Sequence, residues 1–570
     1  MCSDRCDIPH KHVGTVRQTA GRLLDHRMAA TAGSNVQQKI AEVLEGMTFP
    51  AYMNNEESTK ISTPVLTDID SVRQWLEDLR WMTETECMTV LQGKSIQAED
   101  GDSLPSPVRN TKEHIKMVRK RAHIITAECA KLFHKLDKER WKKVHSNALR
   151  ITCTIRSLLH DISTHSPNLA IDVFQQQQVV MEECAQLIKH VESIGEINGE
   201  KPQKLPMVHS LTCLGQAFTR LIDKVLAHEV RTIVEGVADS PSAYCIKASI
   251  TSLVGVAQGE PQMCHLIVKE GGVRALFTIC RQDTANFVKS QALRAVATLC
   301  SVPEAIAEVE KVDGVGCLTD ILCDPLTTEA TRTEVAGVLA QITSPMLDHY
   351  RHVSGFIENM EDLLRGLIGL CETATSPEVF LLGSAAIANI TFLDSMASEF
   401  LARYQVARVL ITSSVRLKVS SIFIKDQLCT VLANVAMLEQ CREDIIKCNG
   451  LTVLVGFLHE KPPYNKQTER VACERVQQKA AIALARLCKD VNTAGVVKQL
   501  RGLQRLVELC RKPKERNYSD SVLVACLATL RKLATVCGED EFSQEDLIQL
   551  VQPRLIDSYL ICSSLQESFV

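Results

Sequence analysis

Along most of the chain, apolar residues recur at spacings of three and four, which is the period of an amphipathic helix. Four long runs of this kind predict helices, and they span Lys112 to Leu136, Arg140 to Ile162, Phe174 to Ile194 and Leu211 to Val237. Gly199, Pro202 and Pro206 lie between the last two runs and predict a loop at 198–206. We therefore expect a helical bundle over residues 111–240.

The second half of the chain repeats itself. Amphipathic runs begin at four glycine positions, where a glycine is expected to permit a sharp turn between units: Gly271-Gly272, Gly314, Gly450 and Gly502. Each unit ends in a short segment of small and apolar residues. The fourth residues of these six segments are Thr298, Gln341, Asn389, Asn434, Arg486 and Lys532. These positions lie 43, 48, 45, 52 and 46 residues apart, close to the armadillo and HEAT period of roughly 40 to 47 residues. We therefore expect armadillo-like repeats over residues 241–555.

These six positions are also candidates for a binding groove. In armadillo repeats the last helix of each unit lines a concave groove, and similarity to that repeat class places these six residues along it. Asparagine at such positions typically holds the backbone of an extended peptide. An alternative is that Asn389 and Asn434 cap or bridge neighbouring helices, since only two of the six positions are asparagine.

Composition supports an all-α fold. Apolar residues make up 45% of the 570 residues but aromatic residues only 4%, so the core must consist mainly of Leu, Ile, Val, Ala and Cys. This mixture suits packed helices better than sheets, and the length exceeds what one ordinary core serves. The formal net charge of -4 provides no strong field, so neither nucleic acid nor an anionic membrane is an expected partner.

The 23 cysteines could form disulfides, bind metal or pack as small apolar residues. Many close an apolar helical run, as do Cys300, Cys488 and Cys510, which favours packing in the core. We find no secretory segment after Met1 and no apolar run of the roughly 20 residues that a membrane span needs. The sequence therefore predicts a cytoplasmic protein with reduced thiols and no inserted segment.

The N-terminal part has a different character. Residues 1–67 mix Gly, Ser, Thr, Asn and His without sustained periodicity, so we expect them to be mostly disordered. The sequence from Ser71 to Gln74 has the form of a capping box and predicts the start of a short helix within 68–98. Apolar residues gather near one face of that helix: Val72, Trp75, Leu76, Leu79 and Met82. The Gly-, Ser- and Pro-containing residues 99–110 are then expected to form a linker.

A helix of about twelve residues is marginal in water by itself, so its apolar face requires a partner surface. Glu84 and Glu86 follow the helix with one residue between them. In an extended chain their carboxylates project on the same side, which suits a groove lined by cationic or amide side chains. Residues 68–98 are therefore predicted to be a linear binding peptide that folds on its partner.

Residues 70–92, which read DSVRQWLEDLRWMTETECMTVLQ, closely resemble the vertebrate Inscuteable segment that binds the tetratricopeptide-repeat groove of Pins/LGN adaptors. The resemblance implies partner contacts by Trp75, Leu76, Leu79, Met82, Glu84 and Glu86. The insect form has proline between the two glutamates, where this chain has Thr85. The resemblance covers about residues 68–570, and it continues through Arg140-Trp141, the Gly271-Gly272-Val273 repeat, 379–382, 388–392, 472–480, 551–555 and 567–570.

The resemblance to the Inscuteable family implies a non-enzymatic adaptor. It would link a Pins/LGN-type tetratricopeptide protein to the cortical Par complex, through a scaffold of the Bazooka kind, and so orient the mitotic spindle in asymmetric cell division. The expected location is the cytoplasm, with recruitment to the cell cortex. Within the tail at 556–570, Ser568, Phe569 and Val570 fit the ligand pattern of PDZ domains, with a functionless tail as the alternative.

Other functional classes receive less support from the sequence. An armadillo-type cargo or transport adaptor would need a regular ladder of Trp and Asn, but the three tryptophans, Trp75, Trp81 and Trp141, all precede the repeats. A regulatory subunit of an enzyme complex would need a copurifying catalytic partner. Zinc-protease, nucleophile-elbow and dinucleotide-binding motifs are missing, and Gly93-Lys94-Ser95 lacks the first glycine of a phosphate-binding loop. Cys2, Cys6, His10 and His12 fit no common zinc spacing, so neither cofactor nor metal is expected.

Overall fold

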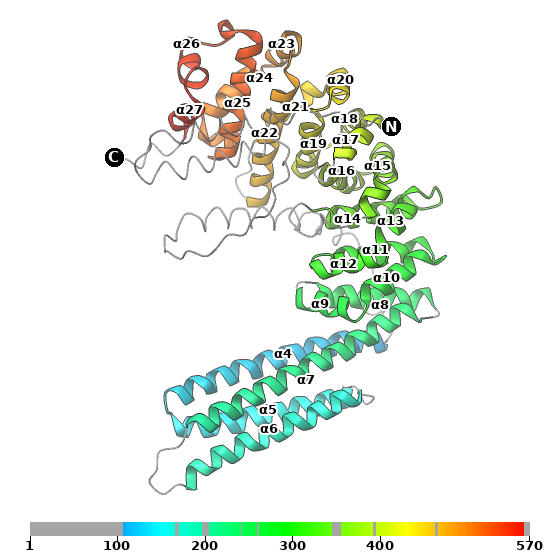
Figure 1. The fold of residues 1–570 in the computed structure, drawn as a ribbon, viewed down its shortest axis with the longest axis vertical. Helices are drawn as coiled ribbons and strands as arrows, with labels where there is room; N and C mark the ends of the chain where they lie inside the picture. The colour runs from blue at the N-terminus through cyan, green and yellow to red at the C-terminus, as the bar shows by residue number, and fades with distance from the viewer. Residues whose placement is uncertain are drawn as a thin grey trace, which may run out of the picture. The chain divides into compact units, whose positions relative to one another are not determined.

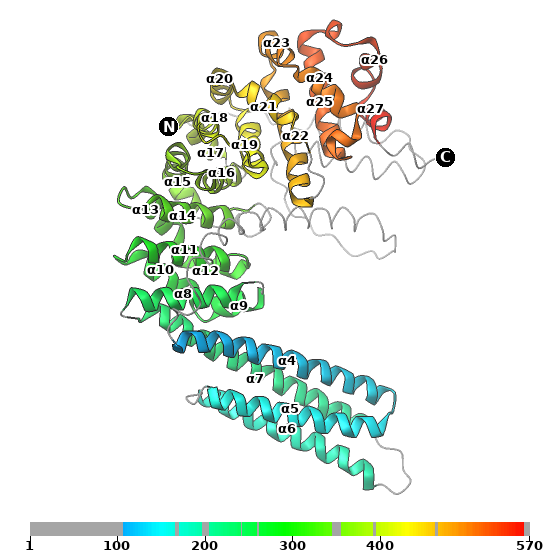
Figure 2. The same cartoon turned by 180° about the vertical axis from the view of Figure 1, so that it is seen from behind.

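The computed structural model describes residues 106–165, 170–196, 204–240, 242–258, 261–344, 355–391, 395–461 and 466–563. Every regular element within these ranges is a helix, which confirms the predicted all-α fold (Figures 1 and 2). The described residues divide into two compact units, one ending at Gly366 and one beginning at Leu367. We call them the N-terminal unit and the C-terminal unit.

The N-terminal unit begins with four long helices: α4 (Ser106–Asp137), α5 (Trp141–His165), α6 (Ile171–Glu196) and α7 (Lys204–Ala238). Consecutive helices pack against each other and α4 also packs on α7, which closes a four-helix bundle (Figure 1). The loop predicted at 198–206 ends earlier than expected, because α7 begins at Lys204 and Pro206 lies in its first turn. Proline is tolerated there because the amide hydrogen it lacks would have no partner within the helix.

Shorter helices follow the bundle in the N-terminal unit: α8 (Ala243–Ala257), α9 (Pro261–Lys269), α10 (Gly272–Arg281), α11 (Asn286–Leu299), α12 (Pro303–Lys311), α13 (Gly314–Cys323) and α14 (Glu329–Ile342). Helix α15 (Gly355–Thr373) continues into the C-terminal unit. Helix α7 contacts α8, α9 and α10, so the bundle packs directly on the first repeats. The core is aliphatic throughout, with Leu276, Leu293 and Leu339 fully buried.

The C-terminal unit consists of further repeats. After α15 come α16 (Pro377–Ile390), α17 (Ser395–Arg403), α18 (Val406–Arg416), α19 (Ile422–Val435), α20 (Glu439–Lys447), α21 (Gly450–Leu458), α22 (Gln467–Leu487), α23 (Val491–Gln499), α24 (Gly502–Arg511) and α25 (Asp520–Cys537). A π-helical turn at Leu547–Val551 and α27 (Leu555–Cys562) pack on α25 and on each other. The last helices of successive repeats, α16, α19, α22 and α25, pack side by side in chain order.

Gly271 makes the predicted turn, with φ of 86°, whereas Gly272, Gly314, Gly450 and Gly502 serve a different purpose. The backbone at Gly450 is helical, and the left-handed conformation belongs to the preceding Asn449, with φ of 60°. A Cβ atom added to Gly450 would lie 2.7 Å from the carbonyl oxygen of Ile445 and 2.5 Å from its Cγ2. The same relation holds at Gly272, Gly314 and Gly502. These glycines are needed because two short helices approach closely, whereas the residue before each of them makes the turn.

Replacing Gly450 with alanine is therefore expected to lower the free energy of unfolding by about 1 to 3 kcal/mol, because the added methyl overlaps backbone atoms. Gly456 in the same helix provides the control, since a Cβ there meets no atom within 4 Å. Gly456→Ala should be neutral or stabilising by up to about 1 kcal/mol. Urea unfolding of both variants tests this, and equal midpoints would contradict it.

The buried cysteines behave as small apolar residues. Cys300, Cys488 and Cys510 are all buried and free. Burial raises the pKa of the Cys300 and Cys488 thiols to about 12, so both stay neutral at physiological pH.

Among the helices that the structure describes, none combines the length and the apolar character needed to cross a membrane.

Candidate functional site

The six residues predicted to line a groove lie on the last helices of their repeats. Thr298 lies on α11, Gln341 on α14, Asn389 on α16, Asn434 on α19, Arg486 on α22 and Lys532 on α25. In the N-terminal unit α11 packs on α14, and in the C-terminal unit α16, α19, α22 and α25 pack in succession. We call these the ladder helices. Each unit thus brings its predicted residues onto neighbouring helices.

Two of the six residues are not available to a peptide. The side chains of Thr298 and Gln341 are only 5% and 4% exposed. The Thr298 hydroxyl donates to the carbonyl oxygen of Arg294 at 3.0 Å, one turn earlier in α11. The groove prediction is wrong at these two positions, because the repeats pack closely enough to cover both side chains.

Two other residues tie neighbouring repeats together. Asn434 is half-buried, and its Nδ2 donates to the Thr391 hydroxyl at 2.6 Å, at the end of α16. Arg486 is also half-buried, and its Nη1 donates to the carbonyl oxygen of Ala433 on α19 at 2.6 Å. Burial lowers the pKa of the Arg486 guanidinium. These bonds correspond to the bridging alternative for Asn434, and they fix the two side chains in place.

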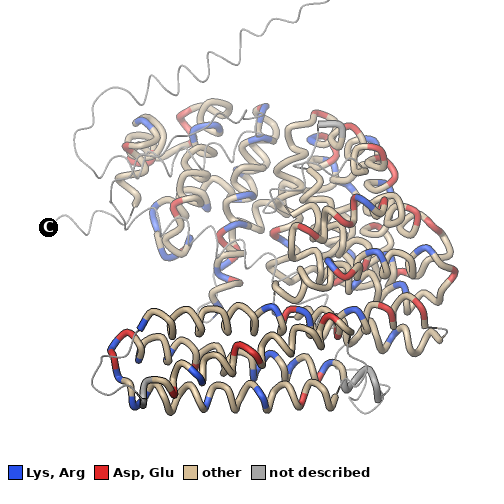
Figure 3. Tube along the Cα trace, turned by 60° about the horizontal axis from the view of Figure 1, so that its bottom comes forward, with Lys and Arg blue, Asp and Glu red and all other residues tan. Residues whose placement is uncertain are grey.

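The remaining two positions differ in exposure. Asn389 on α16 is half-buried, and Lys532 on α25 is exposed. Figure 3 shows acidic and basic positions interspersed along the helices, rather than gathered by sign. The ladder positions of the C-terminal unit that are at least partly exposed are Asn389, Asn434, Arg486 and Lys532. We call these four residues the accessible ladder surface.

A charge cluster between α19 and α22 was not foreseen from the sequence. The Asp426 side chain is 2% exposed, and its carboxylate accepts from Arg475 Nε at 2.7 Å and from Lys479 Nζ at 2.9 Å. Lys479 also donates to the Thr430 hydroxyl at 2.5 Å. Burial alone would raise the pKa of the Asp426 carboxyl, but the charges and hydrogen bonds of the two cations hold it below its usual value.

The only sequence signal for this cluster was the spacing of its two cations. Arg475 and Lys479 lie four residues apart, on one face of α22. Their partner Asp426 lies 49 and 53 residues earlier. The pairing therefore depends on how neighbouring repeats stack, which the spacing of the cations alone does not show. A comparable tie joins Arg294 on α11 to the carboxylate of Glu334 on α14. Charged residues on the ladder helices thus hold adjacent repeats together.

Glu474, next to the cluster, has an unusual carboxyl group. It is 9% exposed, accepts a hydrogen bond from the Asn517 amide and lies on the buried side of α22. Burial raises the pKa of its carboxyl to about 6, against an opposing contribution from hydrogen bonds with Asn517 and Ser519. Near neutral pH the protein therefore holds a buried carboxylate at some cost in stability.

This shift predicts a pH dependence. Because the folded protein binds the Glu474 proton more tightly than the unfolded chain does, the stabilisation is present below the ordinary pKa of 4.5 and is lost as pH rises through about 6. The loss amounts to about 2 kcal/mol. Glu474→Gln should therefore stabilise the protein more at pH 7 than at pH 5, as measured by urea unfolding. The same stability difference at both pH values would contradict this assignment.

The other predicted binding residues lie outside the residues that the structure describes. They are the peptide residues Val72, Trp75, Leu76, Leu79, Met82, Glu84 and Glu86, and the tail residues Ser568, Phe569 and Val570. The linker predicted at 99–110 ends earlier than expected, because α4 begins at Ser106, where the described chain starts.

Two family models match the chain. The model described as "Protein inscuteable C-terminal" matches residues 121–570, and the model described as "Inscuteable LGN-binding domain" matches residues 67–106. The mouse (Mus musculus) protein inscuteable homolog is 44% identical, over 88% of this chain and 88% of its own length. The human (Homo sapiens) homolog is also 44% identical, over 89% of this chain and 88% of its own length.

Solved structures with similar folds include designed repeat proteins. An engineered protein is 18% identical over 79% of this chain and 98% of its own, with a TM-score of 0.44. A designed armadillo repeat protein in complex with peptide (KR)4 is 20% identical over 45% of this chain and 99% of its own, with a TM-score of 0.36.

Proposed function

The chain belongs to the Inscuteable family, and from this premise we propose that it is a non-enzymatic adaptor that captures a Pins/LGN-type tetratricopeptide protein. One observation carries the proposal. The match to the LGN-binding domain covers residues 67–106 and ends at Ser106, where α4 begins. A short binding segment thus precedes a large helical scaffold in the same chain, which is the arrangement an adaptor requires.

The chemistry of the segment supports this partner. Val72, Trp75, Leu76, Leu79 and Met82 would bury one apolar helix face in the partner's groove. Trp75 and Leu79 would act as the anchors of the contact, since buried aromatic and aliphatic side chains dominate binding energy. Glu84 and Glu86 would pair with cationic or amide side chains of the groove and set the register.

The scaffold would supply the second contact of the adaptor. We assign this contact to the accessible ladder surface of the C-terminal unit, where Asn389, Asn434, Arg486 and Lys532 offer amide and cationic groups. The partner would be a Par-complex scaffold of the Bazooka kind at the cell cortex. Coupling the two partners would orient the mitotic spindle in asymmetric division. Ser568, Phe569 and Val570 would add a PDZ contact.

The adaptor proposal is tested by forming a three-component complex. The full chain, a Pins/LGN-type tetratricopeptide domain and a Bazooka-type scaffold are mixed and separated by size-exclusion chromatography. Co-elution of all three components is the expected result. A variant with Trp75→Ala, Glu84→Ala and Glu86→Ala should lose only the tetratricopeptide domain. If the two partners displace each other from the native chain, the linking role is wrong.

A further inference from the structure

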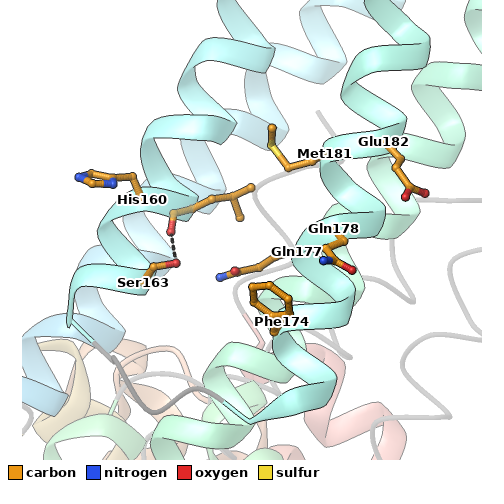
Figure 4. A pocket seen from close by; sticks show the side chains of 8 residues that line it. His160, Ser163, Phe174, Gln177, Gln178, Met181 and Glu182 are labelled. Carbon is orange, nitrogen blue, oxygen red and sulfur yellow. Dashed lines mark hydrogen bonds between the residues drawn. The ribbon is translucent and has the colours of Figure 1, made fainter.

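The bundle carries an open groove that its own helices do not fill. The groove lies between the C-terminal part of α5 and the N-terminal part of α6 and has a volume of about 560 Å³ (Figure 4). Its residues are apolar Leu159, Phe174 and Met181, with polar His160, Ser163, Gln177, Gln178 and Glu182. Phe174 is 55% exposed, and a large exposed aromatic in a hollow is typical of a surface that a partner covers.

A buried polar group in this groove lacks a partner. Gln177 is only 8% exposed, and its Nε2 donates to no acceptor among the residues that the structure describes. Figure 4 shows its side chain extending from α6 into the gap, on the side where Ser163 lies. The Ser163 hydroxyl already donates to the Leu159 carbonyl oxygen at 3.0 Å. The Nε2 atom is itself covered, so it reaches an acceptor in the groove only when the side chain turns outward. Buried amide donors are nearly always satisfied, which favours that turn once an acceptor occupies the groove.

The missing acceptor indicates what kind of segment fits. The carbonyl oxygens within a helix are used by its own hydrogen bonds, whereas an extended segment presents free ones. An extended segment with apolar side chains would therefore both cover Phe174 and accept from Gln177.

The chain itself delivers such a segment to this end of the bundle. Helices α4 and α5 are joined by a short turn and run antiparallel, so the start of α4 lies beside the end of α5. The rings of His114 on α4 and His165 on α5 stack there, with centroids 5.0 Å apart. Within the 105 residues that precede Ser106, the apolar run nearest to α4 is Cys87 to Leu91. The 14 residues between that run and Ser106 span up to roughly 50 Å, whereas neighbouring helices are only about 10 Å apart.

We propose that residues 87–91 occupy the α5/α6 groove of their own chain in an extended conformation. Met88 and Val90 alternate onto one side and cover Phe174 and Met181, while Gln177 Nε2 donates to a main-chain carbonyl oxygen of the segment. This run lies inside the residues matched by the LGN-binding domain. The groove therefore competes with a tetratricopeptide partner for the same residues, and this consequence rests on the proposed function.

The contact itself is tested by hydrogen–deuterium exchange on the full chain, without any partner. A Met88→Asp, Val90→Asp variant leaves the groove sequence unchanged, so exchange at 156–182 can be compared directly with the native chain. We expect several-fold faster exchange there in the variant. Equal exchange in both chains would overturn the proposal. Protection that grows with protein concentration would also overturn it, because it would assign the groove to a second copy.

The competition is tested by calorimetric titration of the full chain with a Pins/LGN-type tetratricopeptide domain. Phe174→Glu should tighten binding by about three- to tenfold, toward the affinity of an isolated peptide of residues 67–106, because it releases the segment. Phe287→Glu is the matched control, since Phe287 is 52% exposed on α11 away from the groove. If the native chain, the Phe174→Glu variant and the isolated peptide all bind the tetratricopeptide domain with equal affinity, the groove does not compete for the segment. If the peptide itself fails to bind, the proposed function is wrong, while the exchange comparison still decides the groove contact.

Discussion

Replacing Asp426 with alanine is expected to lower the free energy of unfolding of the C-terminal unit by about 3 to 5 kcal/mol. The change removes the carboxylate that Arg475 and Lys479 share, at a site where Asp426 is 2% exposed and the two cations are 14% and 26% exposed. Water cannot fully replace the lost negative charge there. The desolvation of the two partly buried cations is then no longer compensated, which destabilises the folded state. The expected result is faster amide exchange across α19 and α22.

A matched variant separates this effect from the general loss of an ion pair. Asp557 pairs with Arg554 at 2.9 Å, but both side chains are well exposed. Asp557→Ala should change stability by no more than about 1 kcal/mol. Similar losses in the two aspartate variants would mean that the α19 to α22 cluster does not hold the repeats together.

Replacing Trp75 with alanine is expected to weaken binding of the segment to a Pins/LGN-type tetratricopeptide domain by about 30-fold or more. Truncating a central buried aromatic anchor typically costs at least about 2 kcal/mol. Glu84→Ala and Glu86→Ala should weaken binding further, because each removes a charge-assisted contact. Fluorescence anisotropy of labelled peptides measures these differences.

The control for these binding variants is Glu77→Ala in the same peptide. Glu77 lies off the apolar face of the predicted helix, so its removal should change the affinity by less than about threefold. An equal loss for Trp75→Ala and Glu77→Ala would indicate that the apolar face does not make the contact.

The helical fold followed from local pattern, because the apolar stripes of long helices are visible in the sequence. Ile151, Ile155, Leu158 and Ile162 in α5 are spaced by three and four residues, and all four are buried. Repeat spacing likewise placed Asn434 and Arg486 on adjacent helices, because equivalent residues of stacked repeats become neighbours.

Features that depend on close approach in space escaped this reasoning. Gly450 reads as a turn residue, yet its role is to leave room for the Ile445 carbonyl oxygen. Thr298 and Gln341 read as groove residues, yet the packing of neighbouring repeats buries them. The partners of Asp426 could not be identified from the sequence, because only the three-dimensional stacking brings residues 49 and 53 positions apart into contact.

The adaptor account rests most directly on the capture of a tetratricopeptide partner by the N-terminal segment. The decisive measurement is a calorimetric titration of a synthetic peptide of residues 67–97 against a Pins/LGN-type tetratricopeptide domain. The account predicts binding in the nanomolar to low micromolar range, and it predicts that binding collapses in the peptide with Trp75→Ala, Glu84→Ala and Glu86→Ala. No detectable binding of the native peptide would contradict the account and would leave the ladder surface as the place to seek this protein's partner.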